Sequence, residues 1–305
     1  MKLKKNKFLI VGGTGFIGSS LARELVQKNQ VFSLSTRLSK MKKKIPKMKY
    51  LRGNIKSFSS LKKVLKNLTF DYVVNCGGYV EHKNKKEVEN SHYKGTQNLY
   101  KFFKNKNLKL FIQIGSSSEY GDAKIPHNEK AKCKPKGIYG KFKYRAAKFL
   151  LNKYKKNKFP VTILRFYQIY GPYQDYNRFI SQLIKSSIKK EKFITSEGKQ
   201  YRDFLYIDDA VNAILKTMIK LKSVGQIINI GYGKGIKLKK IMNKVKKMNN
   251  FFKPDYGKIK MRSDEKLKVY PNITKSLKIL GWKPKVSINK GLEITNKYFL
   301  KELRS

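Results

Sequence analysis

Tyr139 and Lys143 are the pair of side chains whose types and spacing best suit acid–base chemistry. They stand four residues apart in a segment with a helical pattern, so the phenol and the ammonium share one helix face. A phenol with an ordinary pKa of about 10 is a poor base at neutral pH, and a nearby ammonium favours its phenolate. Ser116 ends the preceding predicted strand, at the sheet edge where ligands of open α/β folds bind. The three residues therefore predict a site of proton transfer.

The elements that carry these residues alternate between short β-branched or aromatic runs and longer helical patterns. Such alternation is typical of βαβ units around a parallel sheet. Strands are predicted at Lys7–Val11, Val31–Thr36, Lys49–Arg52, Tyr72–Cys76, Lys109–Ser116 and Val161–Tyr167, with helices at Phe16–Lys28, Ser59–Leu68, Val88–Asn105 and Tyr139–Asn157. After Gly171-Pro172 the pattern is less regular, which indicates a second, smaller lobe. Its predicted elements are helices at Arg178–Lys190, Ile207–Leu221, Leu238–Met248 and Ile288–Leu303 and a strand at Gln226–Ile230.

A glycine-rich turn joins the first predicted strand to the first predicted helix. Glycines permit a tight turn and a close approach of the backbone to a pyrophosphate, which then lies on the helix N-terminus. Because the pattern stands between a strand and a helix, it predicts a Rossmann-type dinucleotide site. Its residues are Gly12, Thr14, Gly15, Phe16, Ile17 and Gly18.

The end of the second predicted strand bears on which dinucleotide is bound. An acidic residue usually stands there and holds the adenosine ribose 2′-hydroxyl. This strand ends in Ser35-Thr36-Arg37 instead, and a guanidinium suits a 2′-phosphate. We therefore expect NADP, with NAD as the alternative if Arg37 is only a surface cation.

Further motifs extend from one end of the chain to the other. They are the GxxGxxG turn, the YxxxK pair, Leu164-Arg165 with Tyr170-Gly171-Pro172, the segment Arg202–Asp209, Arg262-Ser263-Asp264, and Leu280-Gly281-Trp282. With them the chain resembles the extended short-chain dehydrogenases/reductases that act as NAD(P)-dependent sugar-nucleotide epimerases, dehydratases and ketoreductases. The resemblance implies a Rossmann domain over residues 1–170 and a sugar-nucleotide-binding lobe over 171–305, with roughly 203–231 returning to the core. It also implies a homodimer formed through two of the predicted helices.

The resemblance assigns roles to the matching residues. Ser116 would bind the sugar 4-oxygen, Tyr139 would act as acid and base, and Lys143 would orient the nicotinamide ribose. Asn54 stands where the family commonly has an Asp that contacts adenine, and Ile55 follows it. The residues expected to bind substrate are Ser117, Ser118, Asn177, Arg202 and Arg262, of which the two arginines would grip the diphosphate.

Two departures from the family pattern lie near the expected site. His92 stands where Asn is more usual, and Phe142 precedes Lys143 where Ser or Thr is usual. Neither removes the catalytic set. No metal is expected, because His82, His92 and His127 lack ligand spacing.

The residues directly after Ser116 bear on which of the family's reactions the chain catalyses. Family dehydratases carry an acidic pair immediately after the catalytic Ser or Thr, whereas this chain has Ser117 and Ser118. A one-residue gap would make Glu119 that acid, so dehydration is less favoured but stays open. A 4-epimerase keeps NAD bound, while a 4-ketoreductase consumes NADPH. We therefore expect NADPH-dependent reduction of a nucleoside-diphosphate 4-ketosugar in deoxysugar or surface-polysaccharide biosynthesis, with a 4-epimerase or 4,6-dehydratase as alternatives.

The charge of the chain is extreme, with 71 Lys and Arg against 19 Asp and Glu and a net charge of +52. A charge of this size favours nucleic-acid or anionic-membrane binding in general. Here the lysines are spread over the whole length, so we expect no dedicated nucleic-acid partner, although a Rossmann-type nucleic-acid-binding protein is the alternative of another class. No run approaches the roughly 18 apolar residues of a membrane helix. Only two cysteines are present, which favours a reducing, cytoplasmic setting.

Overall fold

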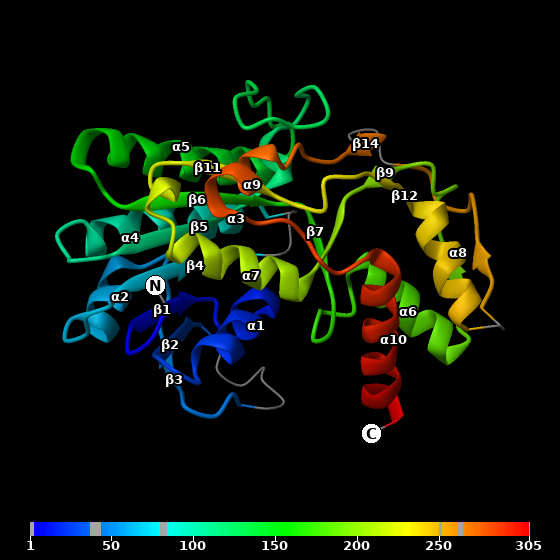
Figure 1. The fold of residues 1–305 in the computed structure, drawn as a ribbon, viewed down its shortest axis with the longest axis horizontal. Helices are drawn as coiled ribbons and strands as arrows, with labels where there is room; N and C mark the ends of the chain where they lie inside the picture. Colours follow the sequence, from blue (N-terminus) through cyan, green and yellow to red (C-terminus); the bar gives the residue numbers. More distant parts are fainter. Residues whose placement is uncertain (1–2, 37–43, 80–83, 250–251, 262–264, 305) are drawn as a thin grey trace.

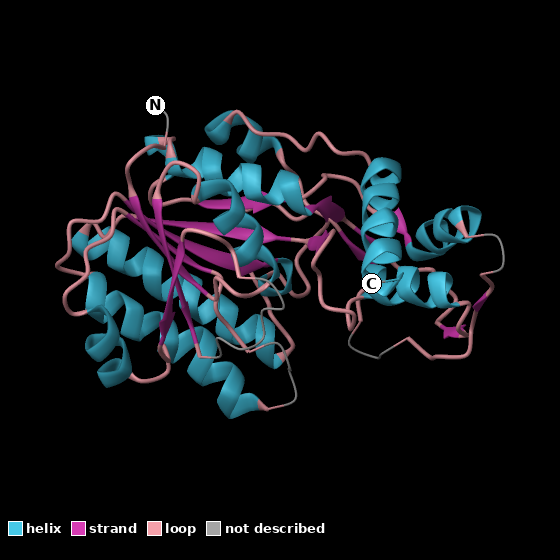
Figure 2. Ribbon diagram, turned by 90° about the horizontal axis from the view of Figure 1, so that it is seen from below, coloured by secondary structure: helices cyan, strands magenta, loops and turns pink. Residues whose placement is uncertain are grey.

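The main sheet of the computed structural model contains seven parallel strands in the order β11-β6-β5-β4-β1-β2-β3. Helices cover both of its faces, so the chain has the doubly wound arrangement that the sequence predicts (Figure 1, Figure 2). The structure describes residues 3–36, 44–79, 84–249, 252–261 and 265–304. The strands are β1 (Lys7–Val11), β2 (Gln30–Ser35), β3 (Met48–Arg52), β4 (Tyr72–Asn75), β5 (Leu110–Ser116), β6 (Val161–Phe166) and β11 (Ile227–Ile230).

The central strands are apolar on both faces because helices bury both faces of a parallel sheet. In β1, Phe8 and Ile10 belong to one hydrophobic core, while Leu9 and Val11 belong to the other. Contacts between elements place α1 (Phe16–Leu25), α7 (Ile207–Met218) and α9 (Thr274–Leu280) in one layer, and α2 (Phe58–Leu65), α4 (Gly95–Phe103) and α5 (Ile138–Asn157) in another. The two cores hold the sheet rigidly between these layers.

The predicted elements of the sheet are confirmed, with ends that differ by a few residues. The helix predicted over Val88–Asn105 begins earlier, as α3 (Lys85–Glu89), and contains one π-helical turn, η1 (Asn90–Lys94), before α4. Helix α9 and the short strands outside the main sheet were not predicted. Short edge pairs of two or three residues carry too little periodicity to be recognised in a sequence.

Most of the remaining elements extend from one end of the sheet (Figure 1). They are β7 (Gln168–Tyr170), α6 (Phe179–Lys189), β8 (Phe193–Ile194), β9 (Tyr201–Arg202), β10 (Phe204–Tyr206), β12 (Ile236–Lys237), α8 (Leu238–Met248), β13 (Pro254–Asp255), β14 (Lys268–Val269) and α10 (Ile288–Arg304). Two short helical turns lie elsewhere: η2 (Ser117–Glu119) directly follows β5, and η3 (Leu221–Ser223) packs against α7 and α9. Helices α6, α8 and α10 pack against one another, and the short strands pair as β10-β7, β12-β9-β14 and β13-β8. Within the described residues, no helix has both the length and the apolar character of a membrane span.

Candidate active site

The glycine turn forms a tight backbone cradle between β1 and α1. Gly12 has a φ of +75°, a conformation that side chains other than glycine rarely adopt. A Cβ at Gly18 would lie 2.4 Å from the Gly12 carbonyl oxygen, so helix and turn could not approach this closely with any other residue. Gly15 stands at the N-cap of α1 and has no side chain that could cap the helix. The first N–H groups of a helix also have no partner within the helix itself. These groups suit a pyrophosphate.

Beside this turn, β2 ends in small hydroxyl side chains. The Thr14 hydroxyl donates to Ser35 Oγ at 3.1 Å, and Ser35 and Ser33 are buried. No carboxylate follows on β2 through residue 36, the last described residue there. Arg37 lies outside the described residues, so its expected contact with a 2′-phosphate stays a prediction.

Asn54 and Ile55 follow the carboxyl end of β3, at the same edge of the sheet as the glycine turn after β1. Asn54 Oδ1 accepts the backbone N–H of Lys56 at 3.0 Å, which leaves its amide N–H₂ as the group able to meet a ligand. Ile55 is 8% exposed and packs in the second core, and its carbonyl accepts from Asn98. Their expected cofactor contacts stay predictions.

Lys143 is fixed from α5 onto the end of β5. It is 5% exposed, and its ammonium donates to the Ile114 carbonyl at 2.7 Å. The same ammonium lies 5.8 Å from the centre of the Tyr139 ring. Helix periodicity thus places the phenol and the ammonium together, as the sequence predicts, and the hydrogen bond to Ile114 holds the ammonium near the carboxyl end of β5.

Ser116 ends β5 and caps the short helix η2. Its Oγ accepts the Ser118 N–H at 3.1 Å, so its own O–H is left to donate elsewhere. A Cβ at Gly140, the residue after Tyr139, would lie 2.4 Å from the Ser118 carbonyl oxygen, so η2 packs directly on the start of α5. The structure therefore brings Ser116, Tyr139 and Lys143 to one place. Ser117 is half-buried and Ser118 is exposed on the same turn.

Glu119 is buried beneath the turn that carries these serines. Its Oε1 accepts the Ser116 N–H at 2.9 Å, and its Oε2 accepts Arg165 Nε at 2.9 Å, with both side chains at or below 1% exposure. Burial lowers the pKa of Arg165, but the Glu119 charge, together with the contributions of Tyr120 and Cys133, raises that pKa above its usual value. The acid expected from the gapped register is thus enclosed in an ion pair.

His92 is a neighbour of Tyr139 whose place the sequence did not reveal. It is 4% exposed in the π-helical turn η1, its ring meets the Tyr139 ring edge-on at 5.1 Å between centres, and its Nε2 lies 3.1 Å from the Tyr79 carbonyl oxygen. The only hint in the sequence was that His92 stands where the family more usually has Asn. Its burial makes it a packing residue of the site, and His82 lies outside the described residues. Among the described residues, no three His, Cys, Asp or Glu side chains gather as a metal site.

Arg202 lies on β9 and is held by an acidic neighbour. Its Nη2 pairs with Glu265 at 2.5 Å, and its Nη1 donates to the Tyr201 carbonyl at 2.8 Å. The adjacent acidic residue, Asp203, instead accepts the backbone N–H groups of Tyr232, Gly233 and Lys234. Burial raises the pKa of Asp203 to about 7, against the lowering effect of those hydrogen bonds.

No described contact brings Arg202 or Asn177 to the serine turn. Asn177 is exposed and directly precedes Arg178, the residue at the N-cap position of α6. Arg262 lies outside the described residues. Their contacts with a nucleotide sugar stay predictions.

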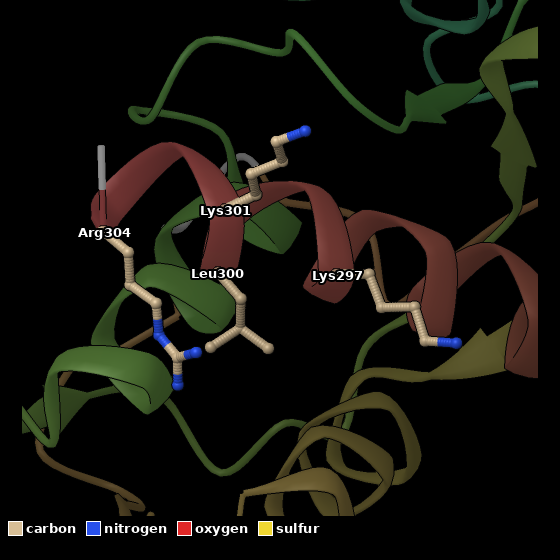
Figure 3. A pocket seen from close by; sticks show the side chains of 4 residues that line it. All are labelled: Lys297, Leu300, Lys301 and Arg304. Atoms are coloured by element: carbon tan, nitrogen blue, oxygen red, sulfur yellow. The ribbon is translucent and has the colours of Figure 1, made fainter.

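An open hollow of about 460 Å³ lies under α10, far from this cluster in the chain (Figure 3). Lys297, Leu300, Lys301 and Arg304 line it, all from one helix. It contains none of the residues expected to do chemistry.

The comparisons with known proteins identify the family of this chain. A sequence model of the NAD dependent epimerase/dehydratase family matches residues 8–231. The chain is 27% identical over 306 residues to a UDP-glucose 4-epimerase of Lactobacillus helveticus, covering 92% of each. It is 35% identical over 132 residues to a CDP-abequose synthase of Salmonella muenchen, covering 43% of this chain and 45% of that one.

Among solved structures, a UDP-glucuronic acid 4-epimerase from Bacillus cereus, in complex with UDP-glucuronic acid and NAD, superimposes with a TM-score of 0.88. That pair is 25% identical, and the match covers 97% of this chain and 99% of that one. The similarity of fold therefore extends over nearly the whole length of both chains.

Proposed function

Because the chain belongs to the NAD-dependent epimerase/dehydratase family, we propose that it exchanges a hydride at C4 of a nucleoside-diphosphate sugar. The observation that carries this proposal is the gathering of Ser116, Tyr139 and the buried Lys143 at the carboxyl end of β5. A set of donors fixed in advance stabilises charge as it develops on a reacting oxygen.

The residues present fit a dinucleotide. The cradle at Gly12 and Gly18 admits no Cβ without a shift, and the adjacent helix N-terminus suits phosphates. When bound, the nicotinamide would supply or take up the hydride. Gly12, Thr14, Gly15, Phe16, Ile17 and Gly18 would hold its pyrophosphate, with Asn54 and Ile55 at its adenine end and Lys143 at its nicotinamide ribose.

The chain's own residues would handle the proton. Tyr139 would give a proton to the C4 oxygen as an alcohol forms there and take it back in the reverse direction. The Ser116 hydroxyl would donate a hydrogen bond to the C4 oxygen of the sugar. Its own oxygen already accepts the Ser118 N–H. The Lys143 ammonium, 5.8 Å from the centre of the Tyr139 ring, would stay beside the phenol during these steps.

Dehydration is disfavoured by the position of Glu119. Both of its oxygens are engaged, one by the Ser116 N–H and one by Arg165, and its side chain is fully buried. A general acid must reach the departing hydroxyl at hydrogen-bonding distance. Glu119 could do this only after the buried ion pair had separated, which is costly because it leaves an unpaired charge.

Two reactions remain for the same residues. Epimerisation at C4 is the first candidate, because a full-length relative and a solved structure with a similar fold are 4-epimerases. Reduction of a 4-ketosugar by NADPH is the second candidate. It is favoured by the end of β2, where Ser35 and Thr36 stand in place of a carboxylate, and by the partial match to CDP-abequose synthase.

The test is to identify the small molecules released when the purified protein is denatured, then to supply UDP-sugars and CDP- or dTDP-4-ketosugars with and without NADPH. Stoichiometric NAD with interconversion of C4 epimers would support the epimerase. An empty or NADP-containing site with NADPH consumption would support the reductase. No turnover of any nucleotide sugar would contradict the proposal. Light scattering would test the expected homodimer in the same samples.

A further inference from the structure

We propose that Glu119 is a positioning residue whose acceptor oxygen sets the place of Ser116, an inference that rests on the proposed function. Glu119 follows Ser116 by three residues, across η2. Its Oε1 accepts the Ser116 backbone N–H at 2.9 Å, while Ser116 Oγ accepts the Ser118 N–H at 3.1 Å. The two reciprocal bonds form a capping box, which fixes both the backbone and the hydroxyl of Ser116.

The carboxylate is itself held in place from the neighbouring strand. Arg165 on β6 donates through Nε to Glu119 Oε2 at 2.9 Å, and its guanidinium carbon lies 4.4 Å from the centre of the Tyr120 ring. Gly115 makes room for this arrangement, since a Cβ there would lie 2.6 Å from Glu119 Oε1. Surroundings this closely packed leave the carboxylate one position.

The support continues away from the site. The Tyr120 hydroxyl donates to Asn229 Oδ1 at 2.7 Å, and Asn229 Nδ2 donates to the His127 carbonyl at 2.9 Å. Three strands, β5, β6 and β11, are thereby joined below the serine turn. The turn packs on Gly140, next to Tyr139, so an error in its position would separate the serine hydroxyl from the phenol.

A matched pair of double variants separates this role from simple stabilisation. Glu119→Gln with Arg165→Met removes the buried charges but keeps an oxygen that can accept the Ser116 N–H. Glu119→Leu with Arg165→Met removes the same charges and the acceptor, with a side chain of similar size. Both variants lose the ion pair, so any general cost of that loss is shared.

With the nucleotide sugar that the wild type converts, we expect kcat of the Leu variant to lie about 10²-fold below that of the Gln variant, the scale of loss from a misplacement of about 1 Å. The KM for the sugar and the affinity for the dinucleotide should be similar in the two. Equal kcat values in the two variants would overturn the proposal.

Hydrogen–deuterium exchange of the peptide containing residues 116–119 gives a readout that does not need turnover. We expect faster exchange there in the Leu variant than in the Gln variant, with equal exchange in α7 as an internal reference. If the wild type converts no nucleotide sugar, the proposed function fails, and equal exchange in the two variants would overturn the positioning role separately.

Discussion

His127 makes the folded protein sensitive to mild acid, and the size of the effect follows from its surroundings. The side chain is 2% exposed, stacks on Tyr120 at 4.5 Å between ring centres, and has Nδ1 2.9 Å from the Tyr167 hydroxyl. Burial, aided by the nearby Arg165 charge, lowers the pKa of His127 from 6.5 to about 4. The unfolded chain thus takes up a proton near pH 6.5, whereas the folded chain resists it down to about pH 4.

The stabilising contribution of the neutral imidazole is therefore present above pH 6.5 and is lost as the pH falls toward 4. A pKa difference of about 2.5 units corresponds to about 3.4 kcal/mol when the loss is complete. Between pH 7 and pH 5, the part lost is about 2 kcal/mol.

Urea unfolding of the wild type and of His127→Gln at pH 7 and pH 5 would measure this. The variant loses the contact with Tyr167 at both pH values, so the change with pH isolates the titration. We expect the free energy of unfolding to fall by about 2 kcal/mol more in the wild type than in the variant over this interval. The same fall in both proteins would refute the reasoning.

Three other substitutions address the cradle, the phenol and a distant anchor. Gly18→Ala places a Cβ 2.4 Å from the Gly12 oxygen, so we expect dinucleotide affinity, measured by fluorescence titration, to fall about tenfold or more; unchanged affinity would contradict the placement of the cradle. Tyr139→Phe should lower kcat by about 10²–10⁴-fold with nearly unchanged dinucleotide binding, and full turnover in a steady-state assay would remove Tyr139 from the chemistry. Asp209→Asn changes a carboxylate that accepts the Lys285 and Val286 N–H groups at 3.0 and 2.8 Å. We expect thermal unfolding to show a free energy of unfolding lower by about 1–3 kcal/mol, with kcat retained; a lower kcat with unchanged stability would contradict this anchoring role.

Local spacing was enough to place much of this protein. The glycine turn lies between β1 and α1 as predicted, because only glycine permits that backbone path. Tyr139 and Lys143 share a face because helix periodicity fixes residues four apart. The alternation of apolar runs predicts the parallel sheet, since both faces of its central strands are buried.

Contacts between residues distant in the chain could not be inferred in this way. Glu119 could have been an acid at the site, and only the approach of Arg165 from the adjacent strand shows it enclosed beneath Ser116. Arg202 could have paired with its neighbour Asp203, yet it pairs with Glu265, 63 residues away. The sequence thus determined which groups are available and which local turns hold them. The tertiary structure decided their partners, because a buried charge is stabilised by whichever opposite charge the fold brings within hydrogen-bonding distance.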